Sequence, residues 1–257
     1  MTAAELAPLR DAGPVPSTSP YPDGTWIRDE RGRVLLIHGT SRLGPRTPAL
    51  AAVAPPSDAG VPTVPESTAG RYPEATFRLP DGLLVADGAG VALVSGGQRR
   101  PLTDEAAVQA HGYADVSALE LAAAQLAGTP LGPALTAEDN LADGAAVRTP
   151  SGALWLVDGG VLEPVTDAML ASRGLASAVA APDPAMLEGL GQSDVLAGFR
   201  DGALIQPADE PVYVVSRGQR HAIRTGEAFA AMGLRADMVR PVTADEAAAH
   251  PVGDPIG

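Results

Sequence analysis

The dipeptide Asp-Gly recurs four times in this chain, at positions 23, 81, 143 and 201. Each copy opens a similar order of short apolar runs, a glycine turn and, in the last three, a helix-forming segment, with spacings of 58, 62 and 58 residues between copies. Two apolar runs joined through glycine are typical of a β-hairpin. Four copies in phase therefore predict a repeat protein, in which each unit packs on another because it cannot bury its own apolar face.

The copies divide the chain into five segments. Residues 1–20 are rich in proline and serine and are predicted to form an extended arm. This arm is either a free tail or a segment that docks on a neighbouring subunit. The four repeats are predicted over residues 21–80, which are divergent, 81–142, 143–200 and 201–257.

The predicted fold is a β-rich α+β repeat protein, each unit a short antiparallel β-meander followed by one or two short helices. Glycine (29 residues) and proline (25 residues) are abundant, which suits many short elements joined by turns. Two arrangements would bury the apolar faces: a closed four-bladed ring resembling a propeller, which removes strand edges, or an open or two-lobed array.

Capping residues mark where the helices begin and end. Thr103, Thr166, Thr225 and Thr243 are predicted N-caps. Ser117–Glu120 has the pattern of a capping box, which predicts a helix running to about residue 127. The predicted helix ends are Gly112, Gly174 and Gly233.

The charge and composition exclude several classes of function. A net charge of -13 argues against binding to nucleic-acid backbones, which requires a basic surface, and against binding to anionic membranes. The chain has no cysteine, so disulfides and thiolate metal sites are excluded. No apolar run approaches the ~20 residues that span a bilayer, and the first residues do not form a signal peptide. We therefore expect cytoplasmic synthesis, followed by assembly in a virion or outside the cell.

The fourth unit resembles a known repeat of cell-wall-associated and phage-type proteins of GC-rich bacteria. The resemblance is carried by Asp201–Ile205, Val212–Val215, Gly218–Ile223, Phe229 and Pro251–Ile256. It extends more loosely over residues 81–200 and weakly over residues 23–80. The resemblance implies a binding or spacer module, and it supplies no catalytic motif.

Four residues are candidates for ligand binding. Trp155 and Tyr213 occupy the same position of their repeats, where an aromatic ring can either stack on a sugar or pack between units. Arg99 and Arg220 are likewise equivalent and can donate hydrogen bonds to a ligand or pair with carboxylates. Leu35 and Ala92 are the counterparts of the two aromatic residues in the other repeats.

No catalytic residues, metal site or cofactor are predicted. The four histidines, His38, His111, His221 and His250, lack the spacing of a helical metal pair and are interpreted as turn or surface residues. The four aspartates of the Asp-Gly pairs would come together only on a ring axis, where two carboxylates could hydrolyse a glycan. Asp-Gly at a strand entry is, however, ordinary turn chemistry.

The sequence therefore favours a non-enzymatic structural or binding protein. It would be an accessory, tail or fibre component of a phage or phage-like particle, or a cell-envelope binder, with protein partners reached through the N-terminal arm. The alternative is a carbohydrate-binding lectin, or a glycan-active enzyme, on a propeller-like scaffold.

Overall fold

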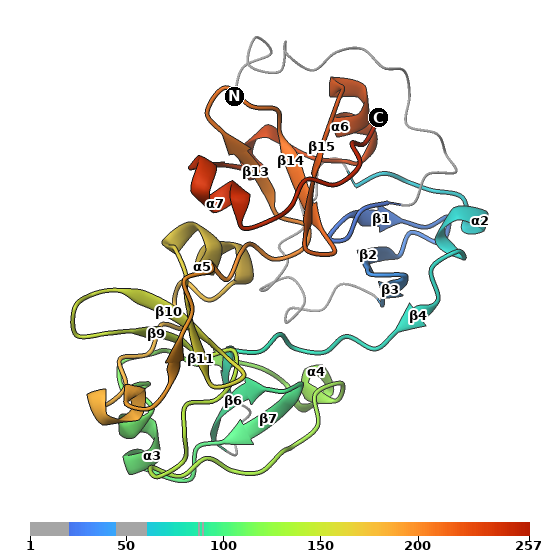
Figure 1. The fold of residues 1–257 in the computed structure, drawn as a ribbon. Helices are drawn as coiled ribbons and strands as arrows, with labels where there is room; N and C mark the ends of the chain where they lie inside the picture. The colour runs from blue at the N-terminus through green and yellow to red at the C-terminus, as the bar shows by residue number, and fades with distance from the viewer. Residues whose placement is uncertain (1–20, 45–60, 87, 89) are drawn as a thin grey trace. The chain divides into compact units, whose positions relative to one another are not determined.

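The computed structural model describes residues 21–44, 61–86, 88 and 90–257, so the predicted arm over residues 1–20 lies outside the described part. The described residues form four four-stranded sheets, one in each repeat (Figure 1). This confirms a β-rich α+β protein built of repeat-like units. A closed four-bladed ring is not shown, since the four sheets are separate.

Repeats 1 and 2 each begin with three consecutive strands, which are followed by a helix. Repeat 1 contains β1 (Trp26–Arg28), β2 (Val34–His38), β3 (Ser41–Leu43), α2 (Glu66–Ala69) and β4 (Glu74–Ala75). Repeat 2 contains β5 (Leu84–Ala86), β6 (Val91–Ser95), β7 (Gln98–Pro101), α3 (Glu105–Ala110), β8 (Leu119–Glu120) and α4 (Ala123–Leu126).

Repeats 3 and 4 follow the same order and add a 3-10 helix each. Repeat 3 contains β9 (Ala146–Arg148), β10 (Leu154–Asp158), β11 (Val161–Pro164), α5 (Asp167–Arg173), η1 (Pro184–Leu187) and β12 (Gly191–Gln192). Repeat 4 contains β13 (Leu204–Pro207), β14 (Tyr213–Ser216), β15 (Gln219–Ala222), α6 (Gly226–Ala231), η2 (Ala236–Met238), β16 (Val239–Val242) and α7 (Ala244–Ala248).

The four repeats share one hydrogen-bonding scheme. The N–H of each Asp-Gly glycine donates to the carbonyl at the same place in the second strand, over 2.7–2.9 Å. The acceptors, in repeat order, are Ile37, Val94, Val157 and Val215. These same four residues pair with the third strand at Arg42, Arg99, Leu162 and Arg220. The predicted hairpins are thus present in every repeat with one register.

The fourth strand of each sheet departs from the predicted antiparallel meander. It pairs in parallel, with the third strand in repeats 1 and 3 and with the first strand in repeats 2 and 4. Isolated parallel bridges add a further segment at the opposite edge of each sheet. Parallel pairing follows because the chain crosses through a helix before it returns to the sheet.

The chain divides into two compact bodies, each made of two repeats. The terminal body joins repeat 1 to repeat 4 and contains the described residues 21–44, 61–76 and 198–257. The central body joins repeat 2 to repeat 3 over residues 77–197. In both bodies the repeats meet at their Asp-Gly turns: a Cβ on Gly24 would overlap the Cα of Gly202, and one on Gly82 would overlap the carbonyl oxygen of Gly144.

Most of the predicted helix boundaries are confirmed, and two are wrong. Thr166, Thr225 and Thr243 cap α5, α6 and α7 through their side chains. The N-cap of α3 is Asp104 rather than Thr103, and the Asp104 carboxylate accepts the N–H of Ala107. Ser117–Glu120 does not open a helix: Leu119 and Glu120 form β8 beside β5, and the helix begins only at Ala123.

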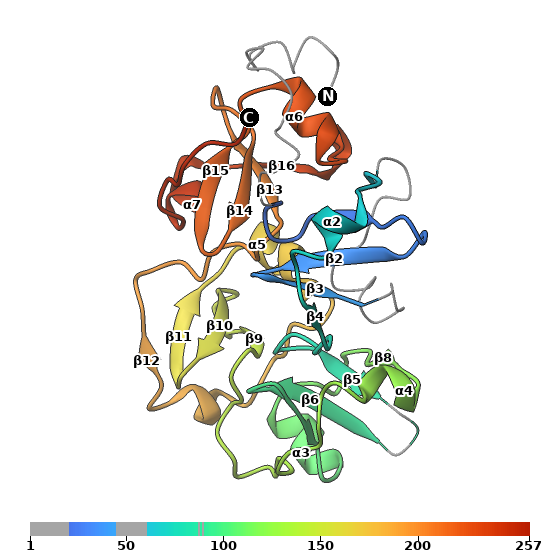
Figure 2. The same ribbon diagram turned by 90° about the vertical axis from the view of Figure 1, so that its right-hand side faces the viewer.

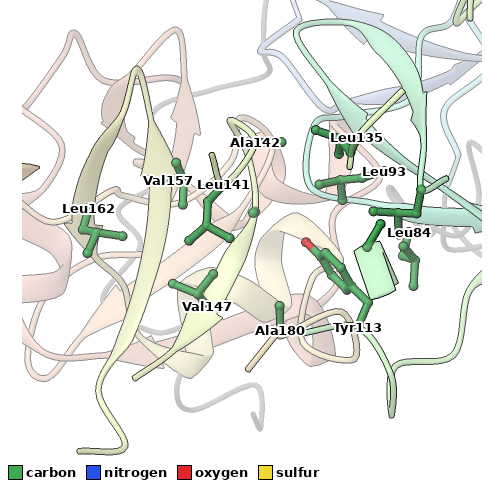
Figure 3. Close-up of a cluster of buried hydrophobic side chains, with 13 residues drawn as sticks. Leu84, Leu93, Tyr113, Leu135, Leu141, Ala142, Val147, Val157, Leu162 and Ala180 are labelled. Carbon is green, nitrogen blue, oxygen red and sulfur yellow. The ribbon is translucent and has the colours of Figure 1, made fainter. Parts of the chain in front are cut away.

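The core of the central body combines both of its repeats (Figure 3). Leu93 of β6 and Ala107 of α3 belong to it, and the two elements lie side by side in Figures 1 and 2. Val157 and Leu162 contribute from repeat 3. Tyr113 also lies in this core, and its hydroxyl is buried without a hydrogen-bond partner.

Replacing Tyr113 with phenylalanine is expected to stabilise the central body by about 1 kcal/mol, because a buried hydroxyl without a partner costs free energy that phenylalanine avoids. Leu175 and Leu234 occupy the same place after the helices of repeats 3 and 4, where each N–H donates back to the helix as that of Tyr113 does. Urea denaturation measures the change. A loss of stability in Tyr113→Phe would show that the hydroxyl makes a bond, for example to a buried water.

Candidate functional site

The strand register confirms the equivalence of the candidate residues. Trp155 pairs with Pro164 and Tyr213 pairs with Ala222, each at the same place in its hairpin. Ala92 of repeat 2 pairs with Pro101 in the same way. Each of these three hairpins therefore carries an aromatic or aliphatic side chain near the start of its second strand, at the end away from the hairpin turn.

Repeat 4 brings Tyr213 and Arg220 together. The Arg220 guanidinium carbon lies 5.1 Å from the centre of the Tyr213 ring, a distance typical of a cation–π contact. The Tyr213 hydroxyl donates to Glu210 Oε2 over 2.9 Å. Burial raises the pKa of Tyr213, and the Glu210 carboxylate raises it further. Tyr213 is 8% exposed, so this arrangement buries most of the ring.

Glu210 was not among the predicted site residues. It precedes Tyr213 by three residues, at the end of the turn between β13 and β14, where an acidic residue alone gives no signal. The acid, the ring and the cation form one cluster on repeat 4, which we call the Tyr213 cluster (Glu210, Tyr213 and Arg220).

The other two candidates lie in the central body and do not share such a cluster. Arg99 donates from Nε to the carbonyl of Thr129 over 2.8 Å, which ties β7 to the chain at the closing edge of its repeat. Trp155 is half-buried and packs against the core of the central body. Ligand binding by Trp155, Tyr213, Arg99 and Arg220 stays a prediction.

The last segment of repeats 2 and 4, which we call the closing segment (residues 130–135 and 251–256), carries a feature that sequence reasoning missed. In repeats 2 and 4 this segment pairs in parallel with the third strand, through the bridges of Arg99 with Leu131 and of Arg220 with Val252. Leu131 is 65% exposed and Val252 is 63% exposed. Val195, which follows β12 in repeat 3 and lies in no bridge of the described sheet, is 67% exposed. The signal in the sequence is Pro-x-Gly with an apolar middle residue, at 130–132 and 251–253.

Two of the repeated aspartates hold the hairpin turns of their repeats. Asp81 Oδ1 accepts the N–H of Gly97 over 3.0 Å, and Asp201 Oδ1 accepts the N–H of Gly218 over 3.2 Å. Each aspartate therefore links the start of its repeat to the hairpin turn of the same repeat. Asp23 and Asp201 belong to the terminal body, whereas Asp81 and Asp143 belong to the central body.

Two histidines predicted as turn or surface residues are buried. His111 is 0% exposed and its Nε2 contacts the carbonyl of Thr136 over 2.9 Å; burial lowers the pKa of its side chain. His250 is 6% exposed and accepts the N–H of Phe199 at Nε2 over 2.8 Å. Both residues lie in a turn or bend, as predicted, but neither lies at the surface, because each ring contacts backbone groups inside its body.

Within residues 21–44, 61–86, 88 and 90–257, no three His, Cys, Asp or Glu side chains lie close enough to hold a metal ion. Among the helices of this part of the chain, none combines the length and the apolar character that crossing a bilayer requires.

Comparisons with known proteins give solved structures but no family. No family model matches the chain, and no curated protein matches it. A subunit from the periplasmic assembly of the ESX-5 inner membrane complex is 12% identical, with 93% of this chain and 94% of that chain covered and a TM-score of 0.20. A subunit of an intact ESX-5 inner membrane complex is 14% identical, with 95% and 81% covered and a TM-score of 0.20. The EccB3 dimer of the ESX-3 core complex is 14% identical, with 89% and 97% covered and a TM-score of 0.17.

Proposed function

We propose that this chain is a non-enzymatic structural subunit that holds other protein subunits of an assembly through the closing segments of its repeats. The observation that carries the proposal is the exposure of Leu131 and Val252 at one repeat position in two different repeats. Large apolar side chains scattered singly over a surface need no explanation. Leu131 and Val252, however, form the equivalent bridge to the third strand in repeats 2 and 4. A partner that contacts both repeats in the same way requires such a recurrence.

The surroundings of these residues favour docking through side chains. Proline flanks both segments, at Pro130 and Pro133 in repeat 2 and at Pro251 and Pro255 in repeat 4. Proline on an edge strand is a device against pairing with another strand. The residues of a bridge lie on one face of the sheet, so an arginine stands beside each exposed aliphatic side chain, and arginine is enriched in protein interfaces.

The test places a photocrosslinking amino acid at position 131 or 252 of the full chain in its native host. Matched controls carry it at the exposed positions Ser151 and Glu227, outside the closing segments. We expect adducts of defined mass with an identified protein from positions 131 and 252 and none from the controls. Leu131→Asp and Val252→Asp should each reduce co-assembly about tenfold or more while leaving the fold intact, because exposed substitutions change stability by within ~0.5 kcal/mol.

The identity of the crosslinked protein separates the assemblies that the chain could serve. A virion protein would assign it to a phage or phage-like particle, and a subunit of an ESX inner membrane complex would assign it to that complex. A chain that gives no adduct at either position overturns the proposal. Retention on isolated cell walls, released by a soluble sugar, would replace it with the glycan-binding alternative through Trp155 and Tyr213.

A further inference from the structure

Two carboxyl groups meet where repeats 1 and 4 pack together. The backbones of Gly24 and Gly202 approach so closely that neither residue has room for a Cβ. Asp23 and Asp201 immediately precede these glycines, and the Asp201 carboxylate lies near enough to raise the pKa of Asp23. The N–H of Asp23 also donates across the junction, to Ser216 Oγ over 3.1 Å.

Asp23 is enclosed at this junction. It is 3% exposed, and its Oδ1 is buried without a hydrogen-bond partner. Burial raises the pKa of Asp23, the N–H of Gly39 lowers it, and the Asp201 carboxylate raises it. A buried carboxylate beside a second carboxylate is costly, and binding one proton to the pair removes the repulsion and adds a hydrogen bond.

We propose that Asp23 and Asp201 form a proton-sharing latch that holds repeat 1 on repeat 4 more firmly in mild acid than at neutral pH. The latch is a property of the junction itself and does not depend on the protein's partners.

Other charged and titratable groups also face Asp23. His38, on the hairpin of repeat 1, favours the ionised carboxylate. Tyr72 interacts with Asp23 from the segment after α2, and Arg217 of repeat 4 interacts with Tyr72. Arg217 also donates to the carbonyl of Gly39 over 3.5 Å. Because His38 acts on the same carboxylate, the test must remove it separately.

The sign of the pH dependence follows from proton binding. In the unfolded chain an aspartate has a pKa of about 3.9, and in the folded chain the pKa of Asp23 is higher. Between these two values the folded state binds more protons than the unfolded state. Stability therefore falls as the pH rises through this window and stays at its lower level above it.

The two tryptophans allow the terminal body to be followed separately in the full chain. Trp26 lies in repeat 1 and Trp155 lies in repeat 3, so Trp155→Phe leaves a reporter of the terminal body alone. At pH 7 we expect Asp23→Asn to raise the urea midpoint of the Trp26 transition by about 0.5 M. The difference from the parent should shrink as the pH falls toward 4. If the urea midpoints of Asp23→Asn and the parent are equal at pH 7, or differ by the same amount at every pH, the proposal is overturned.

Three further variants keep the result interpretable. Asp201→Asn removes the other carboxylate, so its urea midpoint should also exceed that of the parent at pH 7, by a difference that shrinks toward pH 4. This variant leaves the bond from the Gly39 N–H to Asp23 in place, whereas Asp23→Asn could weaken it. His38→Gln should leave that difference in place, whereas its disappearance would assign the effect to His38 and contradict the latch. Asp81→Asn, at the same repeat position in the central body, should leave the Trp26 transition unchanged; an equal rise would mean that loss of any negative charge suffices.

Discussion

Replacing Gly82 with alanine is expected to destabilise the central body by roughly 2–4 kcal/mol. Gly82 has a φ of +89°, where an L residue is strained by about 1 kcal/mol or more. A Cβ there would also overlap the carbonyl oxygen of Gly144 and lie 3.1 Å from Leu175 Cδ1, and overpacking typically costs about 1–3 kcal/mol. Urea denaturation followed by Trp155 fluorescence, in a Trp26→Phe background, measures the loss.

Gly159→Ala is the matched control for this prediction. Gly159 lies in the same body with a φ of +55°, but a Cβ there would meet nothing within 4 Å. It should therefore lose only the ~1 kcal/mol of backbone strain. The excess loss in Gly82→Ala measures the contact between repeats 2 and 3. Equal losses in the two variants would mean that the Asp-Gly turns do not meet closely.

The hairpins and most of the caps could be predicted because their causes are local. Asp201 reaches the N–H of Gly218 within its own repeat, and Thr225 reaches the N–H of Ala228 three residues on. Such bonds join residues of one repeat, here 17 and 3 positions apart, so the pattern of Asp-Gly, turn glycine and threonine predicts them. Repeated in phase, the same patterns predicted the four repeat-like units.

The wrong helix at Ser117–Glu120 shows where local rules fail. These residues have the chemistry of a capping box, but Leu119 and Glu120 pair with Val85 and Ala86 of β5 instead. That pairing extends the sheet by two bridges, and it outweighs a cap that contributes about 1 kcal/mol. A single sequence gives no measure of such competition between segments more than thirty residues apart.

The pairing of the repeats could not be predicted for a related reason. All four repeats present an Asp-Gly turn, so nothing local distinguishes repeat 4 from repeat 2 as the partner of repeat 1. The choice depends on contacts such as that of the Asp23 N–H with Ser216 Oγ, across 193 positions of the chain. The proximity of Tyr213 and Arg220 follows from the register of one hairpin, which is local. The exposure of Leu131 depends on the packing of the whole repeat, and no local pattern predicts it.

Replacing His250 with alanine is expected to destabilise the terminal body by about 1–3 kcal/mol. Because Nε2 accepts the N–H of Phe199, the proton of the neutral ring lies on Nδ1, which donates to the carbonyl of Gly218 over 3.1 Å. Alanine would leave the buried N–H of Phe199 without its partner, at about 1–3 kcal/mol, whereas water can replace the ring at the carbonyl of the exposed Gly218. The midpoint of the Trp26 transition in urea measures the loss.

His221→Ala is the control within the same hairpin. His221 also contacts two carbonyls, those of Asp254 and Ser216, but it is only half-buried, so water can replace the lost bonds. We expect a loss of about 1 kcal/mol or less. His250→Gln should recover part of the stability, because its amide offers one acceptor and one donor at similar reach. If His250→Ala cost no more than His221→Ala, the ring would not be the link between the β14–β15 turn and the entry to repeat 4.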